Sequence, residues 1–230
     1  MDFDEHAADY LATVRRSVAF SGQDGAFFAQ VKADVIVELT AGILGHPSEL
    51  AALDVGCGVG LLTGLVAPAF RAISGSDVSA KSLALAAEQV PSAEFRAGSG
   101  TALPFADDSF DVVYAVCVFH HVEMGDREAL AREMARVARP GGLVMILEHN
   151  PWNPLARWVV SRCPLDRDAR LLSAGVAETL LRRASLRPVA RRYVALLPLG
   201  AGWARGVERT LAGLPLGAQY AVAAVKGKPA

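Results

Sequence analysis

The sequence predicts a single α/β domain with a doubly wound, mostly parallel sheet and helices on both faces. Five short apolar strands alternate with helical segments, and this alternation is typical of βαβ units joined by crossover helices. The chain of 230 residues is long enough for one large domain, and its hydrophobic content of 52% agrees with a large core. No uninterrupted apolar run approaches the roughly 20 residues that a membrane-spanning helix needs, so no membrane span is expected.

Helices are expected in the N-terminal residues 1–45, because apolar side chains recur there at helical spacing on both sides of the break SGQDG. Strands are then expected at 51–55, 72–76, 93–97, 111–117 and 143–148, with helices at 61–69, 79–89 and 127–138. After the fifth strand this alternation ends. Two more apolar strands, at 191–197 and 219–226, have no long crossover between them, so we expect them to form an antiparallel edge.

Composition and charge narrow the functional classes. The chain has 23 Lys+Arg and 24 Asp+Glu, a net charge of -1 that provides no field to attract DNA or RNA, so a nucleic-acid partner is not expected. The N-terminus is acidic and lacks a basic and apolar signal region, which predicts a cytoplasmic location. Cys57, Cys117 and Cys163 lie far apart without a CxxC pair, so we expect neither a disulfide nor a metal site.

A glycine-rich turn links the first strand to the first helix. The segment LDVGCGVG, residues 53–60, places Gly56, Gly58 and Gly60 where the backbone can take positive φ and where a ligand can approach closely. Asp77 follows at the end of the next strand, about 20 residues further on, where a carboxylate can accept hydrogen bonds from both hydroxyls of a ribose. The turn therefore predicts a nucleoside-containing cofactor.

The glycine spacing separates two cofactors. A dinucleotide fingerprint has its third glycine at the position of Leu61, whereas here it comes one residue earlier, at Gly60. The spacing favours S-adenosylmethionine over NAD. Because S-adenosylmethionine has no pyrophosphate, the helix N-terminus can meet its methionine carboxylate, and Asp54 is placed to accept from its cationic groups.

Five motifs in this order resemble those of the class I S-adenosylmethionine-dependent methyltransferases, and in particular the methyltransferase-11 type seen in ubiquinone/menaquinone-biosynthesis-like enzymes. The motifs are LDVGCGVG at 53–60, GSDVS at 75–79, LPFADDSFDVVYA at 103–115, FHHV at 119–122 and RVARPGGLVMI at 136–146. They extend over roughly the first two thirds of the chain. The resemblance implies a Rossmann-like, seven-stranded sheet whose last two strands form an antiparallel edge.

The resemblance also implies the residues that hold the cofactor. The methionine end is expected at Asp54, Gly56, Gly58 and Gly60, the ribose and adenine at Asp77 and Val78, and the lower face of the cofactor at Val116 and Cys117. Ser99, followed by Gly100, stands where the family often has an aspartate that binds the adenine amino group, and serine can accept that hydrogen bond or leave it to water. Tyr10 corresponds to an aromatic residue that closes the N-terminal helix over the cofactor, or else it packs in that helix.

Methyl transfer is an in-line displacement, so the protein mainly aligns the acceptor and excludes water. An oxygen or carbon acceptor must also lose a proton, and a histidine near the strand ends could take it. His120 and His121 follow the fourth strand and His149 ends the fifth, at the edge where open α/β sheets bind ligands. Each of these histidines could instead pack or cap a turn.

The leading interpretation is an enzyme that methylates an oxygen or carbon of a small molecule and releases S-adenosylhomocysteine. An insertion at 150–168 contains Trp152, Trp158 and several arginines, and could form a lid over an aromatic or anionic acceptor, a dimer contact or a packed amphipathic helix. A non-methylating cyclase or decarboxylase and a non-catalytic partner subunit are the alternatives. The single domain then divides into a helical cap (1–45), a cofactor-binding core (46–149), the insertion with a helix (150–185) and a strand pair (186–230).

Overall fold

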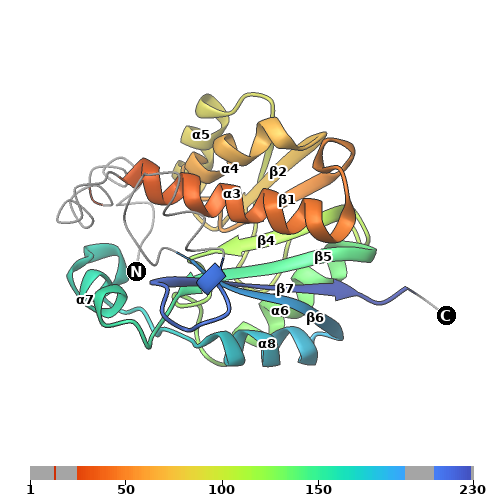
Figure 1. The fold of residues 1–230 in the computed structure, drawn as a ribbon. Helices are drawn as coiled ribbons and strands as arrows, with labels where there is room; N and C mark the ends of the chain where they lie inside the picture. The colour runs from red at the N-terminus through yellow and green to blue at the C-terminus, as the bar shows by residue number, and fades with distance from the viewer. Residues whose placement is uncertain (1–12, 14–24, 195–209, 229–230) are drawn as a thin grey trace.

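The computed structural model describes residue 13, residues 25–194 and residues 210–228 (Figure 1). A seven-stranded sheet in the order β3-β2-β1-β4-β5-β7-β6 forms its centre. The strands are β1 (Ala51–Val55), β2 (Ala72–Asp77), β3 (Glu94–Ala97), β4 (Phe110–Val116), β5 (Ala138–His149), β6 (Leu186–Val194) and β7 (Gln219–Lys226). β7 pairs antiparallel with both β5 and β6, whereas the other pairs are parallel. The predicted fold class, a mostly parallel Rossmann-like sheet with an antiparallel C-terminal edge, is confirmed.

Helices cover both faces of the sheet. They are α3 (Gly25–Leu44), α4 (Leu61–Val66), α5 (Ala80–Gln89), α6 (Arg127–Val137), α7 (Pro154–Arg162) and α8 (Ala174–Arg183). In Figure 1, α3, α4 and α5 lie on one face, α6 and α8 lie on the other, and α7 projects beyond one end of the sheet. In the part of the chain that the structure describes, no helix combines the length and the apolar composition needed to cross a bilayer.

The central strand β4 is buried on both faces, as its continuous apolar run predicts. Val112 and Tyr114 belong to the core beneath α3 and α4, whereas Val113 and Ala115 belong to the core beneath α6 and α8. Successive side chains of a strand point to opposite faces, so one short run contributes to two cores. This double burial holds the carboxyl end of β4 in place, and the candidate site lies at that end.

Short polar side chains define where several helices begin. The Ser79 hydroxyl accepts from the backbone N–H of Ser82 at the start of α5, and the Asn153 side chain accepts from the N–H of Ala156 at the start of α7. Pro154 begins α7 and has no N–H that would need an acceptor. These caps satisfy N–H groups that the helix itself cannot pair.

Two strands begin more than one residue away from the position that the sequence predicts. β5 begins at Ala138, before the expected start at 143, because the Pro-Gly-Gly segment continues the strand through a bulge opposite β4. Gly141 takes a φ of +83° there, and a side chain at Gly142 would meet the carbonyl of Asp111 at 2.9 Å, so both glycines are required by the bulge. β6 begins at Leu186 rather than at 191, and residues 195–197 lie outside the described residues.

The insertion contains α7 and a short 3-10 helix, η4 (Pro164–Asp166). Its first residue, Asn150, is buried and donates from Nδ2 to the carbonyls of Pro215 (3.0 Å) and Gly217 (2.8 Å). Further along, Oδ1 of Asp166 lies 3.2 Å from His120 Nε2. The insertion is therefore anchored both to the loop before β7 and to the loop after β4.

Candidate functional site

The glycine turn between β1 and α4 has three residues with positive φ, at +72° for Gly56, +53° for Gly58 and +82° for Gly60. A Cβ at Gly56 would lie 2.4 Å from Val118 Cγ2, and one at Gly60 would lie 2.9 Å from Ala86 Cβ. At Gly58 no atom lies within 4 Å of such a Cβ. Packing within the protein therefore accounts for Gly56 and Gly60, whereas Gly58 borders open space that a ligand can enter.

Asp77 at the end of β2 is tied to this turn. Its Oδ2 accepts from the N–H of Gly58 at 2.8 Å, and its Oδ1 accepts from the N–H of Ser79 at 2.9 Å. Each carboxylate oxygen has a second lone pair, so Asp77 can still accept from a ligand hydroxyl. Val78, the next residue, is exposed beside it.

Asp54 lies under the turn and is completely buried. Its Oδ2 accepts from the Thr63 hydroxyl of α4 at 2.8 Å. Burial raises the pKa of Asp54 to about 7, although the Thr63 hydrogen bond opposes this rise. The pKa of the Cys57 thiol is also raised, by burial and by the charges of Asp54 and Asp77, so this cysteine remains protonated and is a poor nucleophile.

The loop after β3 carries Ser99 and Gly100, which are both exposed. Gly98, just before them, donates to the carbonyl of Asp77 at 3.0 Å, so the loop lies beside the end of β2. The Ser99 hydroxyl accepts from Thr101 N–H at 3.4 Å. Ser99 and Gly100 thus flank the same edge as Asp77, and their contact with the adenine stays a prediction.

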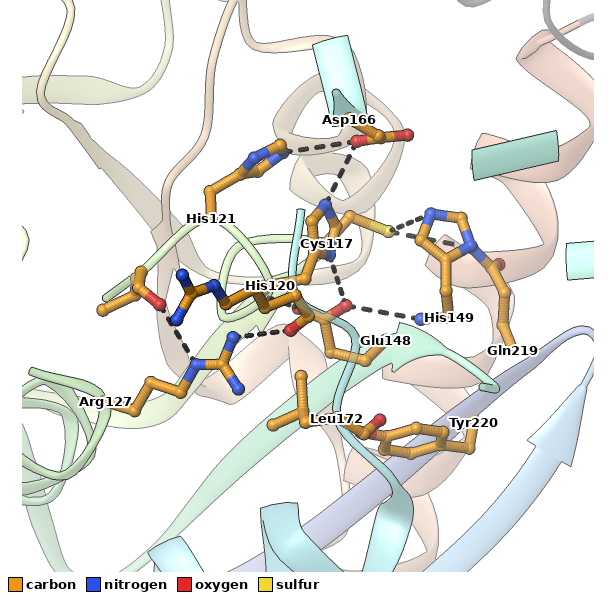
Figure 2. A network of polar contacts seen from close by, with 12 residues as sticks. Cys117, His120, His121, Arg127, Glu148, His149, Asp166, Leu172, Gln219 and Tyr220 are labelled. Atoms are coloured by element: carbon orange, nitrogen blue, oxygen red, sulfur yellow. Dashed lines mark hydrogen bonds and ion pairs between the residues drawn. The ribbon is translucent and has the colours of Figure 1, made fainter. Parts of the chain in front are cut away.

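The end of β4 brings a second group of side chains to this edge (Figure 2). Val116 and Cys117 are half-buried, and the side chain of Val118 lies against Gly56. Cys117 has a φ of +58°, and its Sγ lies 3.6 Å from Lys32 Nζ and 3.6 Å from His149 Nε2.

Burial raises the pKa of the Cys117 thiol, but the charges of Lys32 and His149 outweigh burial and bring this pKa to about 7. Gln219 Nε2 completes the group at 3.7 Å from the sulfur. Lys32 and Gln219 could not be predicted from the sequence, because they are 85 and 102 residues from Cys117 along the chain and carry no motif of their own.

His120 is buried between two carboxylates (Figure 2). Its Nδ1 lies 2.6 Å from Glu148 Oε2, and its Nε2 lies 3.2 Å from Asp166 Oδ1 in the insertion. Burial lowers the pKa of His120, but the two carboxylates outweigh burial and raise it to about 11. The His120 ring is therefore cationic in this arrangement and has no free nitrogen with which to accept a proton.

Burial also opposes ionisation of the two carboxyls, yet His120 holds the pKa of both Glu148 and Asp166 below their ordinary values. Asp166 is a further residue that the sequence did not reveal, because the insertion shows no recognisable motif. It also lies 3.4 Å from His121 Nε2.

The three predicted histidines come together at one edge of the sheet. The ring centre of His120 is 4.1 Å from that of His121 and 5.5 Å from that of His149. His121 and His149 are partly exposed, so a ligand at this edge could reach them, unlike His120. Tyr10 lies outside the described residues, and its predicted place over the cofactor stays a prediction.

The chain is similar to known proteins both in sequence and in fold. Residues 53–146 match the family described as a methyltransferase domain. The chain is 41% identical over 103 residues to methyltransferase GfsG of Streptomyces halstedii, an alignment that covers 42% of this chain and 36% of GfsG. It is 33% identical over 129 residues to the 2-methyl-6-phytyl-1,4-hydroquinone methyltransferase of Synechocystis, covering 54% of this chain and 40% of that protein.

The chain thus spans less than half the length of these curated relatives. A solved structure of an S-adenosylmethionine-dependent methyltransferase from Thermotoga maritima superimposes with a TM-score of 0.69 at 18% identity, over 97% of this chain and 98% of the other. At that identity the likeness establishes the fold. The sequence match, in contrast, includes the glycine turn, Asp77 and the two histidines after β4.

Proposed function

We propose that this chain, whose residues 53–146 match the methyltransferase-domain family, is a class I S-adenosylmethionine-dependent methyltransferase that transfers the methyl group of S-adenosylmethionine to an oxygen or carbon of a small molecule. The observation that carries the proposal is the open space at Gly58 beside Asp77. At the other two glycines of the turn, protein atoms occupy the position of a Cβ. A cofactor with a ribose and an α-amino acid end fits such a turn.

The residues present are suited to each part of this cofactor. The N–H groups at the start of α4 can hold the carboxylate, whereas those of Gly56, Gly58 and Gly60 already donate within the protein. Asp54 can face the ammonium group. Asp77 can accept from the ribose hydroxyls, Val78 can cover the adenine, and Ser99 with Gly100 can border its amino group. Val116 and Cys117 would support the cofactor from the β4 side.

When bound, S-adenosylmethionine supplies an electrophilic methyl group on a sulfonium, and S-adenosylhomocysteine is the product. The protein aligns the acceptor with that methyl group and excludes water. His149 is well placed to take the acceptor's proton because it is partly exposed, lies at the end of β5 and contacts Cys117. His121 is the other accessible candidate, whereas both nitrogens of His120 are engaged by carboxylates.

The insertion supports an aromatic or anionic acceptor. Trp152 is 73% exposed, and Arg162 lies over the ring of Trp158 at 4.5 Å from its centroid. An exposed indole offers a flat face to an aromatic acceptor, and the arginines of α7 offer donors to an anionic one. The relative that methylates a hydroquinone is consistent with an aromatic acceptor.

The test is incubation of the full chain with S-adenosylmethionine labelled in the methyl group and a small-molecule extract. We expect label in a small-molecule product and formation of S-adenosylhomocysteine. The variant His149→Gln should lower the rate by about 100-fold or more if the histidine is the base. The variant His46→Gln changes an exposed histidine before a 3-10 helix and should leave the rate unchanged. Label found only on protein or RNA, or turnover without S-adenosylhomocysteine, would contradict the proposal.

A further inference from the structure

Three potential metal-binding atoms from two distant segments meet at the edge of the sheet (Figure 2). His120 Nε2, His121 Nε2 and Asp166 Oδ1 all lie within 4.8 Å of one another, with the carboxylate oxygen 3.2 Å from the first nitrogen and 3.4 Å from the second. We propose that these residues bind one divalent first-row transition-metal ion of the zinc type. The cysteine spacing predicted no metal site, and the histidines and Asp166 supply one without any cysteine.

The two distances from Asp166 Oδ1 to the histidine nitrogens fit a shared metal ion. Two ligand atoms about 2.1 Å from an ion are about 3.0 Å apart in an octahedral site and about 3.4 Å apart in a tetrahedral one. The two nitrogen-to-oxygen distances lie within or at the edge of this interval. Both imidazoles direct the same ring nitrogen, Nε2, toward the same oxygen of Asp166. The two Nε2 atoms lie within 4.8 Å of each other, so a single ion can bind all three atoms when the partly exposed His121 ring adjusts toward it.

A buried carboxylate already orients one of the ligands. Glu148 is completely buried and lies 2.6 Å from His120 Nδ1, and it also accepts from the backbone N–H of His120 at 3.3 Å. A metal ion that binds Nε2 displaces the proton there, while the proton on Nδ1 stays held by Glu148. Metal-bound histidines usually have such a partner, which fixes the tautomer and raises the basicity of the ligand.

The site is accessible from one side. The side chain of His120 is 1% exposed, that of Asp166 is 13% exposed and that of His121 is 20% exposed. A metal ion can thus enter along His121, while the first ligand stays shielded from water. Two imidazole nitrogens with one carboxylate oxygen favour zinc, cobalt or iron(II) over magnesium and calcium, which prefer oxygen ligands.

Three protein ligands leave coordination positions for a ligand from solution, as in catalytic rather than structural metal sites. A metal ion here would lower the pKa of an acceptor hydroxyl, and this role rests on the proposed function. Metal binding itself does not rest on it, since it is measured without S-adenosylmethionine and without an acceptor.

The experiment titrates the chelator-treated full chain with Co²⁺, followed by visible absorption, and with Zn²⁺, followed by calorimetry. We expect one equivalent of each ion to bind, and neither Mg²⁺ nor Ca²⁺ to bind comparably. His121→Gln and Asp166→Asn should each weaken binding about 10-fold or more, and Glu148→Gln should weaken it about 10- to 100-fold through the orientation of His120. Circular dichroism shows which variants retain the fold, and His121→Gln is the mildest because its side chain is partly exposed.

The matched control is His46→Gln, which removes an exposed histidine away from the three ligands and should bind Co²⁺ like the unaltered chain. Failure of the unaltered chain to bind either ion at one equivalent would overturn the proposal. Unchanged binding in folded His121→Gln, or loss of binding in His46→Gln, would also overturn it. Methyl transfer with no metal binding would contradict the metal site alone, and metal binding with no methyl transfer would contradict the proposed function alone.

Discussion

The variant Gly58→Ala tests whether a bound ligand occupies the space beside Gly58. Gly58 has a φ of +53°, and no atom lies within 4 Å of the position that a Cβ would take. An alanine there keeps the backbone N–H that donates to Asp77 and meets no protein clash. Its cost is that of an L-residue in the left-handed region, about 1–2 kcal/mol in the free energy of unfolding.

For a chain of this size that cost corresponds to a fall of about 2–8 °C in the melting temperature. The new methyl group would occupy the space assigned to the cofactor, so we expect S-adenosylhomocysteine to bind at least about 10-fold more weakly, a loss of about 1.4 kcal/mol or more. Calorimetric titration measures the affinity, and thermal unfolding measures the stability.

The control is Gly45→Ala. Gly45 is exposed at the end of α3, has a φ of +97° and also has no atom within 4 Å of its Cβ position. This variant should lose stability in a similar way and keep full affinity for S-adenosylhomocysteine. If Gly58→Ala bound the ligand as tightly as Gly45→Ala does, the cofactor would not occupy the space beside Gly58.

Three further predictions concern the carboxylates of the turn and the anchor of the insertion. Asp77→Ala should weaken S-adenosylhomocysteine binding by about 1–3 kcal/mol in calorimetry, through loss of charge-assisted ribose bonds, and an unchanged affinity would exclude the residue from the site. Burial raises the pKa of Asp54 to about 7, above its value of about 3.9 in the unfolded chain. The contribution of Asp54 to the free energy of unfolding therefore falls by about 1.4 kcal/mol per pH unit as the pH rises from about 3.9 to about 7, and is constant above that. In denaturation at pH 5, 6 and 8, Asp54→Asn should therefore gain on the unaltered chain as pH rises, and a difference independent of pH would refute this. Asn150→Ala should cost about 1–3 kcal/mol, because the carbonyls of Pro215 and Gly217 lose their donor and that of Gly217 is buried, and a cost below about 0.5 kcal/mol in chemical denaturation would contradict that assignment.

The fold could be predicted because its signals are local. Strand β7 lies at the predicted residues 219–226, because its uninterrupted apolar run pairs with β5 on one side and β6 on the other. The start of β5 was missed because Pro140, Gly141 and Gly142 normally end an element, and only the pairing with β4 keeps them extended. Local signals thus identified the elements, while tertiary contacts moved their boundaries.

The candidate site could be predicted only where its residues form motifs. The glycine turn and Asp77 belong to one βαβ unit, so their spacing is visible in the sequence. Lys32, Gln219 and Asp166 reach the site from α3, β7 and the insertion, and only the folded arrangement brings them to Cys117 and His120. The contacts of His120 with Glu148 and Asp166 likewise could not be predicted from the two adjacent histidines in the sequence.

The structure of the chain in complex with S-adenosylhomocysteine tests the central claim most directly. We predict that the homocysteine carboxylate lies at the N-terminus of α4, that the ribose hydroxyls lie within hydrogen-bond distance of Asp77, and that the sulfur faces the edge formed by Cys117 and His149. A ligand bound elsewhere, or a chain that does not bind S-adenosylhomocysteine at millimolar concentration, would contradict the account.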